Sequence, residues 1–87
     1  MPTTNLKYQS NWECLGSISA ISQYGETESF MLFVKVIGEK EFYKVEPQIQ
    51  SISYSLSYSV TKGKYSFKGK NYNAKFSVHG TDYYFNL

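Results

Sequence analysis

A strict alternation of apolar and small polar residues runs through residues 51–61, which read SISYSLSYSVT. The apolar members share one face of an extended chain, and the serines with one threonine share the other. A helix would distribute these apolar residues around its whole circumference, whereas a strand keeps them on one side. The segment therefore predicts one long strand that is half-buried.

The same period of two continues toward the C-terminus. Residues 62–64 (KGK) predict a turn, and residues 65–78 predict two strands joined by a tight connection near residues 69–71. Residues 79–82 (HGTD) predict a further turn, and residues 83–87 a short terminal strand. Connections this short join antiparallel neighbours, so the C-terminal half predicts a meander of about four strands.

The N-terminal half is less regular. Residues 29–37 (SFMLFVKVI) are apolar on both faces, as expected of a central strand covered on each side. Residues 38–40 predict a turn, and residues 41–46 a strand that ends at Pro47 because proline cannot donate to a ladder.

Residues 12–24 fit two structures. A period of two joins Trp12, Cys14, Ile18, Ala20 and Tyr24, with Gly16 as a bulge, whereas Leu15, Ile18 and Ile21 fit one face of a short helix. We favour the strand, because the frequent serines compete with a helix by bonding to the backbone.

The expected fold is a single all-β domain over residues 1–87, either a small antiparallel barrel or a two-sheet sandwich of six to eight short strands. Hydrophobic residues make up 41% of the chain and aromatic residues 18%, which is too apolar for a disordered segment. One modest core is all that a chain of 87 residues can bury.

Composition also limits the compartment and the chemistry. The single cysteine cannot form an internal disulfide, and no signal peptide or apolar run of about 20 residues is present, so we expect a cytoplasmic protein with no membrane partner. All nine basic residues are lysines, so no bidentate guanidinium is available for phosphate or guanine. Abundant Lys, Asn, Ile, Tyr and Phe are typical of AT-rich codons and favour a phage, a mobile element or a low-GC bacterium.

The residues that could carry catalysis are few. Cys14 and His79, with Asp82 to orient the imidazole, would have to meet in space. We interpret His79 instead as a turn residue and Cys14 as a small buried hydrophobe. One cysteine and one histidine are too few for a zinc site. We therefore expect no enzyme activity, no metal and no cofactor.

A lysine-rich, aromatic stretch at residues 62–76 suggests nucleic acid. Cations that follow a phosphate backbone, with aromatic rings that stack on bases, are what single-strand binding on a sheet requires. The alternation, however, places the aromatics opposite the lysines, and the net charge of +2 is small for this function. The candidate residues are Lys62, Lys64, Lys68, Lys70, Lys75, Tyr65 and Tyr72.

The leading hypothesis is a non-catalytic binding protein that contacts an unidentified protein partner, and a phage or mobile-element inhibitor of a host defence protein is one form of it. Two surfaces suggest this contact: the bare serine face of residues 51–61, and acidic turns in the N-terminal half that could replace phosphates. The candidate residues are Ser53, Ser55, Ser57, Ser59, Glu26, Glu28, Glu39 and Glu41. The nucleic-acid module is the second hypothesis. A structural component that assembles into homo-oligomers through open strands is the third.

Overall fold

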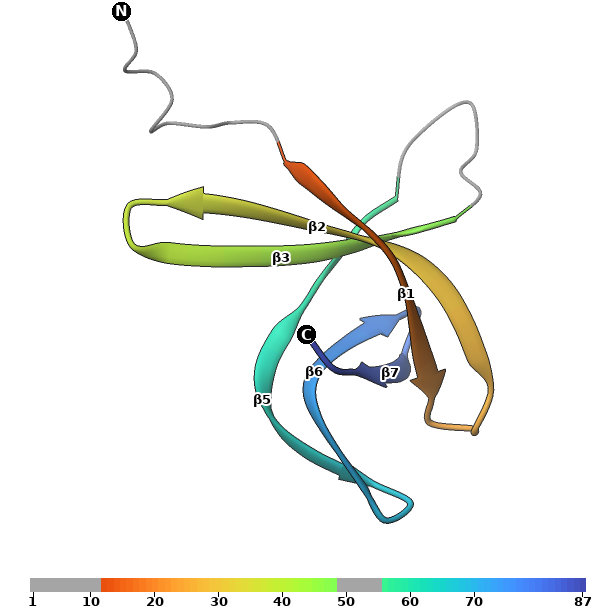
Figure 1. Cartoon of the computed structure of the whole chain (residues 1–87). Coiled ribbons are helices and arrows are strands. Elements are labelled where there is room, and N and C mark those ends of the chain that lie inside the picture. Colours follow the sequence, from red (N-terminus) through yellow and green to blue (C-terminus); the bar gives the residue numbers. More distant parts are fainter. Residues whose placement is uncertain (1–11, 49–55) are drawn as a thin grey trace, which may run out of the picture.

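One antiparallel sheet contains every strand of the described residues, 12–48 and 56–87, in a computed structural model (Figure 1). The strands are β1 (Glu13–Ser22), β2 (Thr27–Ile37), β3 (Lys40–Pro47), β4 (Tyr58–Ser59), β5 (Thr61–Phe67), β6 (Lys70–Val78) and β7 (Thr81–Phe85). Their order in the sheet is β4-β3-β2-β1-β7-β6-β5. The predicted all-β antiparallel fold is confirmed, and the sheet curls into a half-barrel instead of pairing with a second sheet.

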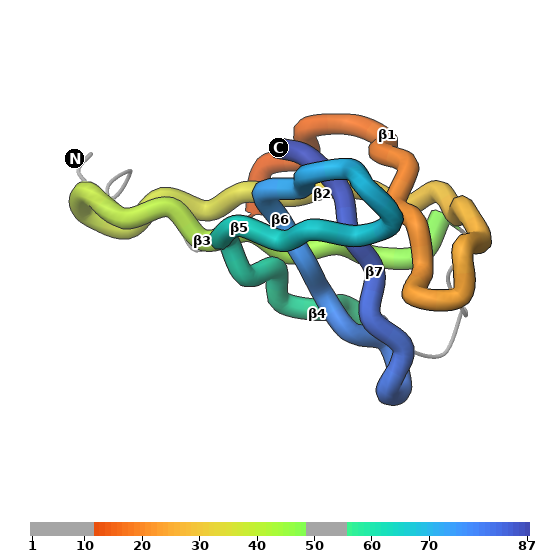
Figure 2. Tube along the Cα trace, turned by 90° about the horizontal axis from the view of Figure 1, so that it is seen from below, coloured from red at the N-terminus to blue at the C-terminus, as the bar shows by residue number. Residues whose placement is uncertain are grey.

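The two ends of this sheet are joined by a single residue. β4 pairs with β3 at one end and β5 pairs with β6 at the other, yet only Val60 separates β4 from β5. The Val60 amide still donates to the Tyr43 carbonyl of β3, at 3.0 Å, before the chain crosses to β6. The sheet therefore has to curl, because one continuous stretch of chain supplies strands to both of its ends (Figures 1 and 2).

Two predictions near this crossing are wrong. The expected long strand at 51–61 breaks at Val60, and Leu56 and Ser57 lie in no strand; residues 51–55 are outside the described part of the chain. The expected turn at 62–64 is absent, because β5 runs through these residues as a strand. The pairing of β5 with β6 shifts register between Lys62 and Tyr65 instead, as at a β-bulge. A bulge bends and twists a strand without ending it, which the crossing requires.

The ambiguous segment at 12–24 forms strand β1, as favoured, and the predicted bulge is confirmed between Cys14 and Gly16. Gly16 has φ of 113°, a conformation that L side chains rarely adopt. The expectation that 29–37 is covered on both faces is wrong, because the two buried residues of this strand share one face and Met31 and Phe33 on the other face are only half-buried. Phe30 and Leu32 are buried, but Val36 and Ile37 are about half exposed.

The C-terminal meander is confirmed for its last three strands, β5, β6 and β7, which two-residue turns join, whereas β4 pairs with β3 instead. Lys68 and Gly69 join β5 to β6, and His79 and Gly80 join β6 to β7. All four residues have positive φ, between 50° and 86°. Two successive positive φ values are the type I′ pattern, whose twist matches that of the flanking strands.

Aromatic rings fill the core of the half-barrel. Phe76 of β6 stacks on Tyr83 of β7 at 5.2 Å, and both rings meet the edge or face of Phe30 from β2. Phe85 completes the group at 5.8 Å from Phe76. The remaining buried apolar residues are Ala20, Leu32, Val45 and Ala74. The core therefore holds together strands from both ends of the sheet.

Phe76→Ala should lower the free energy of unfolding by about 3–5 kcal/mol, because it leaves a cavity among three other aromatic rings. The matched control is Phe42→Ala, since Phe42 is 44% exposed and should cost about 0.5 kcal/mol or less. Urea unfolding followed by circular dichroism measures both. Equal losses for the two variants would contradict this description of the core.

Polar contacts support the β6–β7 hairpin. The Ser77 hydroxyl donates to the Asp82 carboxylate at 2.5 Å, and the Lys75 ammonium lies 3.5 Å from the other carboxylate oxygen. The hydrogen bond from Ser77 and the charge of Lys75 hold the pKa of Asp82 below its ordinary value, although partial burial opposes them. The ionised carboxylate therefore stabilises the folded state.

A carboxylate whose pKa is lowered by folding stabilises the folded state at pH values above its pKa in the unfolded chain. This stabilisation is lost as the pH falls through the pKa of the folded state. The difference in unfolding free energy between the natural protein and Asp82→Asn should therefore be largest near neutral pH, at about 1 kcal/mol or less for a pair this exposed. It should shrink on acidification below the ordinary aspartate range. Urea titrations at a series of pH values test this, and a difference independent of pH would contradict it.

Candidate functional site

The β2–β3 hairpin extends beyond the rest of the sheet (Figures 1 and 2). β1 pairs with β2 only as far as Val34, and β4 pairs with β3 only as far as Lys44. Within the described chain, residues 35–42 are therefore a two-stranded ribbon. The molecule is elongated, with dimensions of 50 × 33 × 20 Å. Two strands alone are marginally stable in water, so an extension of this kind calls for an explanation.

Large apolar side chains lie exposed on this ribbon. Val36, Ile37 and Phe42 are 46%, 48% and 44% exposed. Other exposed apolar residues, such as Leu15 and Tyr24, lie elsewhere on β1 and its turn. The register places Ile37 and Phe42 on one face of the ribbon and Val36 on the other. Single exposed hydrophobic residues are ordinary, whereas neighbouring ones on a projecting element, such as Ile37 and Phe42, indicate a surface for another molecule.

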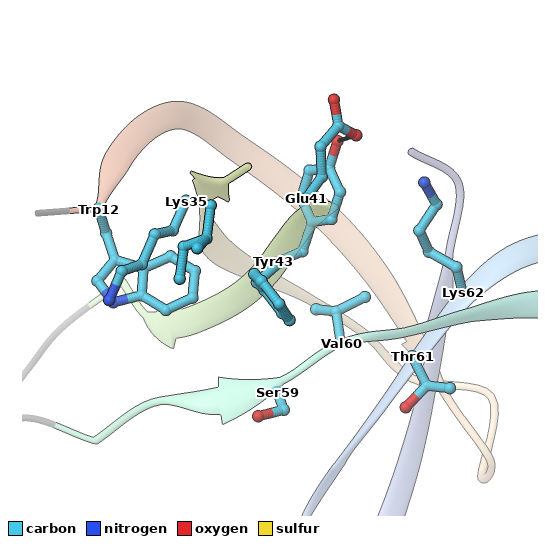
Figure 3. A pocket seen from close by; sticks show the side chains of 10 residues that line it. Trp12, Lys35, Glu41, Tyr43, Ser59, Val60, Thr61 and Lys62 are labelled. Atoms are coloured by element: carbon cyan, nitrogen blue, oxygen red, sulfur yellow. Dashed lines mark hydrogen bonds between the residues drawn. The ribbon is translucent and has the colours of Figure 1, made fainter. Parts of the chain in front are cut away.

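A groove of about 530 Å³ lies along the outer edge of β3, and we call it the β3-edge groove (Figure 3). Trp12 and Lys35 form one end, Tyr43 and Val60 lie in the middle, and Lys62 lies at the other end. The remaining lining residues are Ile37, Glu41, Phe42, Ser59 and Thr61. The groove exists because β5 turns away from β3 toward β6 at this point.

Cations lie over aromatic rings along the groove and beside it. The Lys44 ammonium lies 4.9 Å from the centre of the Trp12 ring, and Lys35 lies 5.4 Å from the same ring. Lys62 lies 5.4 Å from the Tyr43 ring. Tyr43 donates its hydroxyl proton to Glu41 at 2.8 Å, and this bond raises the pKa of Tyr43. The groove thus combines aromatic surface with charges of both signs.

The backbone of β3 is open at Glu41. Ile37 and Lys40 flank a two-residue turn, so their backbone groups bond to each other. Because bonded and non-bonded pairs alternate along an antiparallel ladder, the backbone N–H and C=O of Phe42 point toward β2 and those of Glu41 point away from it. The register that places Tyr43 opposite Val60 would place Lys62 opposite Glu41, but Lys62 pairs with Ala74 of β6 instead. No strand of the described chain therefore meets the outward peptide groups of Glu41.

A second surface lies on β5, β6 and β7, away from the core. Tyr84 stacks on Phe67 at 5.2 Å, and Tyr65 and Tyr72 each lie 6.0 Å from Tyr84. We call these four half-buried residues the aromatic face. Tyr84 lies opposite the core because its neighbours Tyr83 and Phe85 point inward.

Some of the lysines predicted for nucleic acid lie with these rings. The Lys75 ammonium is 5.6 Å from the Tyr65 ring, and Lys68 is 5.5 Å from Phe67. The predicted separation of lysines from aromatics does not hold for Phe67, because its ring lies beside Lys68 and it pairs with Lys70 across the ladder. Phe76, in contrast, is buried, as that prediction required.

The other predicted lysines are placed differently. Lys64 lines a pocket of about 460 Å³ beside Tyr65 and Tyr72, while Lys70 is exposed at the start of β6. Lys62 belongs to the β3-edge groove. We call the pocket beside Tyr65 and Tyr72 the amide pocket, because its wall also includes Asn71, Asn73 and Asn86.

The residues predicted to contact a protein partner do not form one surface. Ser53 and Ser55 lie outside the described residues, whereas Ser57 and Ser59 are exposed. Glu26 and Glu28 lie near the start of β2, and Glu39 and Glu41 lie beyond its other end. The two acidic pairs therefore lie at opposite ends of β2, a strand of roughly 35 Å along its path. Glu28 accepts a hydrogen bond from the Tyr83 hydroxyl at 3.1 Å. The pKa of Tyr83 is raised mainly by burial of its hydroxyl and, to a smaller extent, by this hydrogen bond.

Cys14 and His79 do not form a dyad. Cys14 is exposed near the start of β1, so the prediction that it is buried is wrong: this end of β1 extends past the core. His79 lies in the turn beyond the other end of β1, where its ring meets Tyr58 at 6.3 Å. Within residues 12–48 and 56–87, no group of three or more His, Cys, Asp or Glu residues could hold a metal ion. The same ranges contain no helix with the length and apolar character of a membrane span.

The sequence did not predict five of the residues on these surfaces, namely Trp12, Val36, Ile37, Phe42 and Tyr84. Ile37 and Phe42 flank a predicted turn within a run of apolar residues, and this position was the available signal for exposure. Tyr84 carried no signal, since its place among the other rings depends on which strands neighbour β7.

Comparison with known proteins adds no relationship. No family model matches this chain, no curated protein matches its sequence, and no solved structure matches its fold.

Proposed function

We propose that this protein is a non-catalytic binding protein that acts by contact with a protein partner through the β2–β3 hairpin. The observation that carries this proposal is the projecting ribbon of residues 35–42 with Ile37 and Phe42 exposed together on one face. A partner that covers these side chains would remove apolar surface from water, which favours association by about 25 cal/mol per Å² before the costs of binding.

The open backbone beside the β3-edge groove suggests the mode of contact. The outward N–H and C=O groups of Glu41 face no strand of the described chain, and the groove next to them is lined by Tyr43 and Val60. An extended segment of a partner could add to β3 here, since main-chain bonds supply affinity and side-chain pockets supply specificity. Aromatic Trp12 and Phe42 on the groove wall are of the type that dominates binding energy at interfaces.

An inhibitor of a host defence protein, encoded by a phage or mobile element, is one form of this proposal. It is supported by residue usage alone, and a cytoplasmic location is supported by the presence of a single thiol. Of the four glutamates suggested as phosphate substitutes, only Glu39 and Glu41 lie on the hairpin. A phosphate-mimicking surface made of all four has no support in this arrangement.

Glu41→Pro should weaken binding of the protein partner by about tenfold or more, because proline removes an outward donor from the β3 edge while the β2–β3 ladder keeps its bonds. Glu41→Gln is the matched control, since it removes the charge and keeps the donor. The partner is first captured from a low-GC bacterial extract on the immobilised protein, and its affinity is then measured by calorimetry. Equal affinities for both variants would exclude strand addition at this edge.

The combined variant Ile37→Ser and Phe42→Ser tests the apolar surface with the same purified partner. Loss of interface anchors should weaken binding by about 30-fold or more. Leu15→Ser combined with Tyr24→Ser removes exposed apolar surface at a different place and should change the affinity little. If the control weakens binding as much as the hairpin variant does, the partner contacts another face. Sedimentation of the protein alone separates a foreign partner from a second copy of this chain, which is the self-assembly hypothesis.

A further inference from the structure

The aromatic face exposes a group of rings that the core does not require. Phe67 lies on Tyr84 with an angle of 20° between the rings, and Tyr65 and Tyr72 are tilted beside it. All four are half-buried, so part of each ring is open to solvent. Such surfaces accept flat ligands, because a π-face stacks on any aromatic base.

Lysines predominate in the part of the sequence that carries most of these rings. The sequence contains five lysines and no acidic residue from Pro47 to Thr81. Lys64, Lys68 and Lys75 lie beside the rings, and Asp82, the one nearby carboxylate on β7, is already engaged by Ser77 and Lys75. A ligand that stacks on this face and complements its charge is both aromatic and anionic.

The amide pocket offers hydrogen-bonding groups next to the same rings. Tyr65 and Tyr72 line it together with Asn71, Asn73 and Asn86. The backbone holds two of these amides in place: the Asn86 side chain accepts from the Asn73 amide at 2.9 Å, and the Asn73 side chain accepts from the Leu87 amide at 2.7 Å. Oriented amides beside a stacking surface are suited to the edges of unpaired bases.

We propose that the aromatic face and the amide pocket together bind single-stranded nucleic acid. A duplex keeps its base faces inside the stack, where these rings cannot reach them. Among the described residues there is no helix to enter a major groove, and the chain has no arginine for guanine. This binding uses a different part of the sheet from the β3-edge groove and does not depend on the proposed protein contact.

The test is fluorescence anisotropy with labelled oligonucleotides of about 12 nucleotides, as single-stranded DNA, single-stranded RNA and the matching DNA duplex. Both single strands should bind more tightly than the duplex, and the ratio of their affinities assigns the ligand to DNA or RNA. The affinity should fall with salt at a slope of about 0.7 for each phosphate contact. Equal or tighter binding of the duplex, or no binding of single strands at about 50 mM salt, would overturn the proposal.

Tyr65→Ala should weaken single-strand binding roughly 5- to 100-fold through loss of stacking, whereas Tyr65→Phe should keep most of the affinity. Tyr24→Ala, in the exposed β1–β2 turn, is the control for removal of a surface tyrosine. Equal affinities for Tyr65→Ala and Tyr24→Ala would show that the rings do not stack on bases.

A lysine pair keeps the test decisive if Tyr65→Ala does not fold. Lys64→Gln combined with Lys68→Gln should reduce the salt slope by about 1.4, for two lost phosphate contacts. Lys35→Gln combined with Lys40→Gln makes the same change in net charge on the β2–β3 hairpin and should leave the slope unaltered. Identical salt slopes for the two double variants would show that the nucleic acid is attracted by net charge alone, and this would overturn the proposed site.

Discussion

The change of pairing partner between Ser59 and Thr61 is the constraint on which this structure depends. One stretch of chain pairs first with β3 and then with β6, so the two ends of the sheet cannot move apart. The curl places β2 and β3 over β6 and β7, and this arrangement lets Phe30 meet Phe76 and Tyr83. The core is therefore a consequence of the crossing as much as of the apolar residues that fill it.

The same crossing produces both candidate surfaces. Where β5 leaves β3, the outer edge of β3 loses its neighbour, which opens the groove beside Glu41 and leaves the hairpin as a two-stranded extension. Where β5 joins β6, the register shift between Lys62 and Tyr65 turns Tyr65 toward Lys75 and Tyr84. A small sheet has few ways to expose aromatic side chains without losing its core. Here the crossing exposes those of the β3-edge groove, and the bulge in β5 exposes Tyr65 on the aromatic face.

Charge distribution separates the two surfaces chemically. The hairpin carries glutamates and lysines together with large apolar side chains, a mixture typical of contacts between proteins. The aromatic face has lysines beside its rings, and the nearby carboxylate of Asp82 is engaged by Ser77 and Lys75. The lack of arginine affects both, since neither surface can offer the bidentate contacts that favour a buried ion pair or a specific base pair.

The sequence by itself determined the fold class, most strand positions, the bulge at Gly16 and the turns at Gly38, Gly69 and Gly80, because these follow from local alternation and from backbone conformations that glycine permits. The alternation could not show where the chain stops pairing with β3 and starts pairing with β6, since a strand has the same period of two whichever strand it pairs with. The break at Val60, the bulge in place of a turn at residues 62–64, and the exposure of Cys14 and Ile37 were therefore decided by tertiary structure. The β3-edge groove combines segments distant in sequence, so which side chains meet in it follows from the order of the strands in the sheet. The aromatic face is built from three consecutive strands, and there the register shift in β5 decides which side chains meet.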